Sequence, residues 1–89
     1  MNDTSFFRII RTCEAKYDAD ETVKYVVFST SNNLFLGVVI YMDRQFNAES
    51  NENTTQEKHF PSVSEKQAAD SCEEWIKQNI SNNVSISCT

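Results

Sequence analysis

The sequence predicts an α+β fold, in which an antiparallel β-sheet of four to five strands carries one amphipathic helix on one face. Segments 5–14, 22–30 and 34–46 are rich in β-branched and aromatic residues, which favours strands. Residues 64–80 instead place apolar side chains at three- and four-residue spacing, which indicates a helix. The 89 residues suffice for a single domain, 1–89.

The first two predicted strands differ in how cleanly they alternate. In residues 5–14, Phe7, Ile9 and Cys13 fall on one face, but they share it with Arg11. Residues 22–30 alternate well and place Val23, Tyr25 and Val27 on one buried face. The following stretch SNN (31–33) predicts a hairpin turn, because Asn tolerates a positive φ better than most residues.

The third predicted strand is apolar on both faces as far as Met42. This pattern is typical of a strand inside a sheet, or of one that lies under a helix and against a partner. Gly37 indicates a bulge or the close approach of another element. Residues 47–58 are polar and predict a flexible loop, or a loop that leads into a short edge strand ending near Phe60.

The helix has clear start and stop signals. Ser64 and Gln67 form a capping box, and Val63 with Ala68 predicts a hydrophobic staple. The stretch SNN (81–83) ends the helix, and residues 84–88 predict a last strand. The apolar stripe expected to cover the sheet comprises Ala68, Ala69, Cys72, Trp75, Ile76 and Ile80.

Cysteine usage and the first residues predict a cytoplasmic protein. Cys13, Cys72 and Cys88 are odd in number and widely spaced, and no signal-peptide pattern precedes them, so we expect three reduced thiols. On that basis the Asn-x-Ser/Thr matches at Asn2, Asn53, Asn79 and Asn83 are chance. No stretch approaches the ~20 apolar residues of a membrane span, so no membrane partner is expected.

No catalytic or metal-binding pattern is present, so we predict no enzyme, no cofactor and no metal site. A single glycine excludes a nucleophile elbow, a Walker loop and a dinucleotide fingerprint. His59, the only histidine, is expected to be exposed or partly packed, and the cysteines lack the short spacing of zinc ligands. The paired carboxylates predict a solvated surface, because a core this small leaves little room for a substrate cleft.

The formal charge of −5 and the pI near 4.7 argue against direct nucleic-acid binding. We therefore expect a protein partner with a basic surface. The block HFPSVSEKQAADSCEEWI, after a predicted hairpin, resembles the strand-then-helix pattern of small phage-encoded anti-CRISPR and other anti-defence inhibitors. The resemblance covers about a quarter of the chain, and many small α+β proteins share the pattern.

This resemblance implies a stoichiometric inhibitor in the cytoplasm of the host cell, with carboxylates that mimic phosphates or pair with Arg and Lys of the target. The residues expected to bind the partner are Asp70, Glu73 and Glu74 on the helix, with Asp18, Asp20 and Glu21 in the first loop. An immunity protein that neutralises a bacterial toxin would need the same acidic surface.

The aromatic residues predict a further alternative, a self-associating structural module. One helix covers only one face of a sheet, so some aromatic side chains should remain on the other face and form a homodimer contact. Phe28, Phe35 and Tyr41 are the residues expected there. The opposing interpretation is that the polar segment 47–58 folds over this face.

Overall fold

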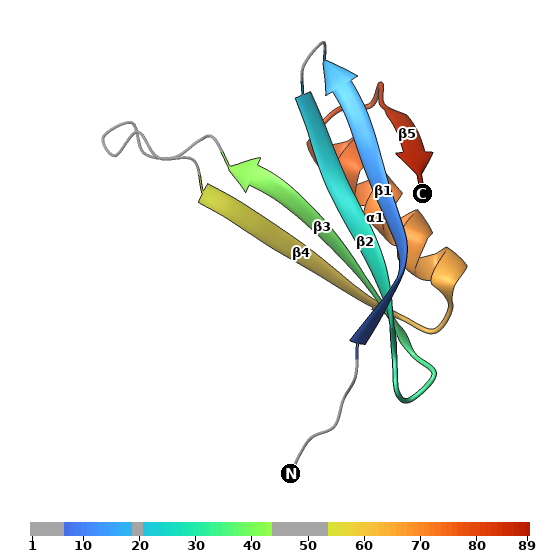
Figure 1. The fold of residues 1–89 in the computed structure, drawn as a ribbon. Coiled ribbons are helices and arrows are strands. Elements are labelled where there is room, and N and C mark those ends of the chain that lie inside the picture. The colour runs from blue at the N-terminus through green and yellow to red at the C-terminus, as the bar shows by residue number, and fades with distance from the viewer. Residues whose placement is uncertain (1–6, 19–20, 44–53) are drawn as a thin grey trace.

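The computed structural model describes residues 7–18, 21–43 and 54–89 and shows a five-stranded antiparallel sheet with one helix packed against it (Figure 1). This confirms the predicted fold class. The strands lie in the order β4-β3-β2-β1-β5, and all neighbours are antiparallel. The elements are β1 (Phe7–Asp18), β2 (Glu21–Thr30), β3 (Phe35–Asp43), β4 (Thr54–Ser62), α1 (Glu65–Asn79) and β5 (Ser85–Cys88).

The core is a single layer between α1 and one face of the sheet, which we call the helix-covered face. Alternate residues of β2 point into it, and Val23, Tyr25 and Val27 are all buried as predicted. The other buried members of this core are Cys13, Ala15, Val39, Ala68, Ala69, Cys72 and Ile76.

The opposite face, which we call the open face, carries the other alternate residues of the same strands. The strand register places Val26 beside Val38, and Phe28 beside Leu36. Lys24 lies beside Ile40 in the next row. The two apolar faces of the third strand, β3, have different neighbours. One face packs under α1, and the other lies on the open face between β2 and β4 (Figure 1).

A β-bulge in β1 reverses the alternation expected from the sequence. Ile9 pairs with Phe28, but Arg11 pairs with Val27, so the register shifts between Ile9 and Arg11. Arg11 therefore lies on the helix-covered face with Cys13, whereas Ile9 lies on the open face with Phe28. The prediction that Phe7 and Ile9 share a face with Cys13 is wrong for this reason.

Gly37 marks the closest approach of α1 to the sheet. A Cβ atom at this position would lie 2.8 Å from the carbonyl oxygen of Ala68 and 2.7 Å from Sγ of Cys72. Only a residue without a side chain fits at such distances. The close approach predicted from the sequence is confirmed, and the small residues of the helix face it.

The turn and the helix ends follow their local signals closely. Asn33 adopts a φ of 62° in the β2–β3 turn, as expected. Ser64 caps α1 by accepting a hydrogen bond from the backbone N–H of Gln67, and Gln67 Oε1 accepts one from the N–H of Val63. Val63 stays 72% exposed, so it does not form the predicted staple.

The last part of the segment predicted as a flexible loop is a strand. Residues 54–58, which the sequence placed in that loop, form the first half of β4 and pair with the second half of β3. This strand continues to Ser62 at the sheet edge, so the alternative of an edge strand near Phe60 holds, with a longer strand than expected. Residues 47–53 lie outside the described residues.

A disulfide joins Cys13 to Cys88, with 75 residues of sequence separation, so the prediction of three reduced thiols is wrong. The pairing follows from topology: β5 lies beside β1, and the register places the two cysteines opposite each other. The free cysteine, Cys72, lies on α1 and is buried against the sheet as a small apolar residue. The disulfide removes the cysteine usage as a ground for predicting a cytoplasmic location.

Candidate interaction surfaces

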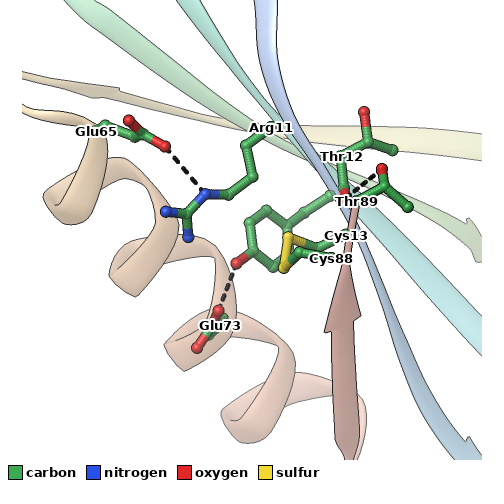
Figure 2. The surroundings of a disulfide bond; sticks show 8 residues. Arg11, Thr12, Cys13, Glu65, Glu73, Cys88 and Thr89 are labelled. Carbon is green, nitrogen blue, oxygen red and sulfur yellow. Dashed lines mark hydrogen bonds and ion pairs between the residues drawn. A yellow bond between two sulfur atoms is a disulfide. The ribbon is translucent and has the colours of Figure 1, made fainter.

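A polar cluster links the helix to the sheet near the disulfide (Figure 2). The hydroxyl of Tyr25, a fully buried residue, donates a hydrogen bond to Glu73. Arg11 reaches from β1 to the first turn of α1, where its Nε donates to Glu65 Oε2 at 3.1 Å. The cluster fixes α1 at two points that lie two helical turns apart.

The electrostatics of this cluster indicate a structural role. Burial raises the pKa of Tyr25 above its ordinary value, and the carboxylate of Glu73 raises it further. Burial alone would lower the pKa of Arg11, but its contacts with Tyr25 and Glu65 raise it overall. Tyr25 therefore stays protonated and Arg11 stays charged at neutral pH, so neither side chain acts as an acid or base there.

The acidic residues predicted to bind a partner do not all remain available. Glu73 accepts a hydrogen bond from the hydroxyl of Tyr25, and Asp70 pairs with Lys66 at 2.9 Å on the exposed side of α1. The contact with Asp70 raises the pKa of Lys66. Glu74 is exposed, and its Oε2 accepts a hydrogen bond from Gln78 at 3.4 Å.

Of the acidic residues predicted in the first loop, the structure describes Asp18 and Glu21. Glu21 begins β2, and its Oε1 accepts a hydrogen bond from the hydroxyl of Tyr17 at 3.4 Å. Asp20 lies outside the described residues. The structure describes only the backbone of Asp18, which pairs with Glu21.

The open face presents a group of apolar side chains to solvent. Ile9 is 58% exposed, Met42 51% and Phe7 52%, and the ring of Phe7 meets that of Phe28 edge-on at 5.9 Å. On the same face, Val26 and Val38 are buried, while Phe28, Leu36 and Ile40 are partly buried.

Two of the three residues expected on this face lie elsewhere. Phe28 is on the open face, but Phe35 and Tyr41 pack against the core on the helix-covered face. There Tyr41 contacts the ring of Trp75 at 4.9 Å. Sequence reasoning put Phe35 and Tyr41 on the same face as Phe28 because it did not fix the register between β2 and β3.

Charged side chains of both signs border the apolar part of the open face. Glu14, Lys24, Ile40 and Glu57 lie side by side in one row across β1, β2, β3 and β4. His59, on the same face of the edge strand, lies 3.0 Å from Glu57. Both side chains are about half exposed, and such ion pairs contribute little to stability.

A hollow opens in the sheet where the β2–β3 ladder ends. The β2–β3 ladder ends at Lys24 and Ile40 while both outer hairpins continue, and a notch of about 260 Å³ opens between them. The residues that line this notch include Tyr17, Glu21, Tyr41 and Ile80.

Within the described ranges, no three His, Cys, Asp or Glu side chains are placed to hold a metal ion. Burial and the charge of Glu73 raise the pKa of the Cys72 thiol to about 12, which makes it a poor nucleophile.

In the part of the chain that the structure describes, no helix has the length and apolar character that a bilayer crossing requires. Comparison of this chain with protein-family models, with curated proteins and with solved structures finds no match.

Proposed function

We propose that this chain is a non-enzymatic protein-binding domain and that the open face is its binding surface. One observation carries the proposal: none of the described elements covers the apolar side chains of this face, because α1 lies entirely on the other side (Figure 1). Ile9 and Met42 are more than half exposed, and Phe28 and Ile40 lie between them, partly exposed. Exposed apolar side chains gathered on one face of a small protein mark an interface.

The charges around this surface define the partner it fits. Lys24 and Glu57 flank Ile40 in the same row, on β2 and β4. A partner with an apolar centre and charges of both signs would complement this pattern, whereas a uniformly basic partner would meet repulsion at Lys24.

The inhibitor predicted from the resemblance is a second proposal, and one observation favours it. The side chains of Asp70 and Glu74 are exposed on the outer side of α1, where a basic surface could reach them. The geometry supports it less well than the open face, because Glu73 is held by Tyr25 and Asp70 by Lys66. An immunity protein would depend on the same residues.

Two variants separate these proposals. Ile9→Ser/Met42→Ser removes exposed apolar side chains from the open face, and Asp70→Asn/Glu74→Gln removes exposed charge from α1. Both sets are exposed, so both variants should fold, which circular dichroism checks. The wild-type chain and each variant are immobilised and offered a soluble protein extract together with a tagged copy of the chain itself.

We expect proteins held by the wild-type chain to remain on the α1 variant and to be lost from the open-face variant. Retention by the open-face variant with loss from the α1 variant would overturn the proposal in favour of the inhibitor. A wild-type chain that holds neither another protein nor its own copy would contradict both proposals.

A further inference from the structure

We infer that the protein that covers the open face is a second copy of this chain, packed face to face about a two-fold axis parallel to β3. The inference rests on the proposed function, because it names the partner of the same surface. It follows from the order of the side chains across the open face, which the strand register determines.

The row at the end of the β2–β3 ladder carries charges that complement themselves. Lys24 on β2 and Glu57 on β4 lie on either side of Ile40 on β3. A two-fold axis along β3 places β4 of the second copy opposite β2 of the first. Lys24 then lies opposite Glu57 of the second copy, and Glu57 lies opposite Lys24 of the second copy. One axis thus produces two pairs of opposite charge around a contact between the two Ile40 side chains.

In the same arrangement the row of Val38 sets Val26 on β2 opposite His59 of the second copy, and the row beyond it adds apolar contacts. Val38 and Leu36 follow Ile40 along the open face of β3, so each meets its counterpart on the axis. The row of Leu36 contains Phe28 on β2 and Pro61 on β4. Phe28 therefore lies opposite Pro61 of the second copy, and the apolar stripe of β3 becomes the centre of the interface.

Charge also selects this axis over the other simple two-fold arrangement. An axis through the same row but perpendicular to the strands would place Lys24 opposite Lys24 and Glu57 opposite Glu57. Directly opposed like charges are destabilising. The axis parallel to β3 avoids both contacts, and it gives the two sheets the aligned packing that is common in β-sandwiches.

An axis along β3 sets β2, β3 and β4 of one copy against β4, β3 and β2 of the other, so three strands form the contact. Three strands spaced about 4.8 Å apart, with nine residues that rise about 3.3 Å each, give a contact on the order of 400 Å² in projection. A standard interface buries ~800 Å² of accessible surface on each partner, so we expect a dimer that dissociates on dilution. At a sheet separation of about 10 Å, the side chains of Lys24 and Glu57 can meet across the interface.

Charge reversal tests the inference without touching the core. We expect the wild-type chain to sediment as a dimer at micromolar concentration and to dissociate on dilution. Lys24→Glu and Glu57→Lys should each raise the dimer dissociation constant about tenfold, because each reversal turns two attractive pairs into repulsive ones. The double variant Lys24→Glu/Glu57→Lys restores both pairs, so its dissociation constant should return to within about threefold of the wild-type value.

The matched controls are Lys77→Glu and Glu74→Lys, which change the net charge equally but lie exposed on α1. They should leave the dissociation constant within about threefold of wild type. The inference is overturned if the single reversals leave the dimer dissociation constant unchanged, or if the double variant does not restore it. A monomeric chain whose open face still holds another protein overturns it too, but leaves the proposed function intact.

Discussion

Val27 and Phe28 are adjacent on β2, yet they lie in two different environments. Val27 is fully buried beneath α1, whereas Phe28 is partly exposed on the open face. The helix-covered face uses small residues where α1 comes close, with Gly37 opposite Ala68 and Cys72. The open face carries larger apolar residues with no described element above them. The first face holds the fold together, and the second is available to another protein.

The largest expected effect concerns the covalent link on the helix-covered side. Reduction of Cys13–Cys88 should lower the free energy of unfolding by about 4 kcal/mol, because the bond closes a loop with a sequence separation of 75. Urea unfolding with and without reductant measures the difference. The control is Cys13→Ala/Cys88→Ser, whose stability should not depend on reductant.

Thiol counting tests the same bond chemically. The folded, oxidised chain should give no rapid reaction with a thiol reagent, because Cys72 is buried and its pKa is raised to about 12. Unfolding in denaturant should release one thiol per chain. Three thiols in chain that was never exposed to reductant would contradict the disulfide and restore the expectation of reduced cysteines.

The two faces can next be compared with one type of substitution. Ile76→Ala on the helix-covered face should cost about 2–5 kcal/mol, because Ile76 is fully buried and its removal leaves a cavity. Ile40→Ala on the open face should cost about 1 kcal/mol in the monomer, because Ile40 is only partly buried. Denaturant unfolding at a concentration where the chain is monomeric provides both values, and equal costs would remove the distinction between the faces.

Features determined by neighbouring residues could be predicted from the sequence. Ser64 caps the helix, Asn33 turns the hairpin, and the stripe from Ala68 to Ile76 packs on the sheet. Each depends on spacing within one segment, so periodicity and local hydrogen bonding are sufficient. The fold class followed from these segments because one helix and several strands pack in few ways.

Features determined by the pairing of distant segments could not be predicted. The bulge at Ile9–Arg11 depends on how β1 meets β2, and the disulfide depends on β5 lying beside β1. Glu73 looked like a solvated carboxylate because Tyr25, its partner, is 48 residues away. The candidate site was uncertain for the same reason, since Phe35 and Tyr41 could be assigned to a face only through the register.

A smaller effect should follow from filling the closest contact. Gly37→Ala should lower the free energy of unfolding by about 1–3 kcal/mol, because the new methyl group would overlap with the carbonyl of Ala68 and with Sγ of Cys72. In a chain that already carries Cys72→Ala, Gly37→Ala should still lower the free energy of unfolding, but by less, because the backbone carbonyl of Ala68 remains in place. No loss in that chain would show that α1 is free to move away from the sheet, and no loss in the wild-type chain would contradict the close approach.

The smallest effect compares polar contacts on the two faces. Tyr25→Phe should cost about 1–2 kcal/mol at neutral pH, because Glu73 loses its donor in a partly buried site. Glu57→Gln, which removes the exposed pair with His59, should cost less than about 0.5 kcal/mol.

The pKa of Tyr25 is raised in the folded chain above its ordinary value of 10.0, so the unfolded chain loses this proton first as the pH rises. The stability from Tyr25 is therefore fully present below pH 10.0 and declines above it, by at most about 1.4 kcal/mol per pH unit. Urea unfolding across this range should show a steeper alkaline decline for wild type than for Tyr25→Phe, and identical slopes would mean that the hydroxyl is not held by Glu73.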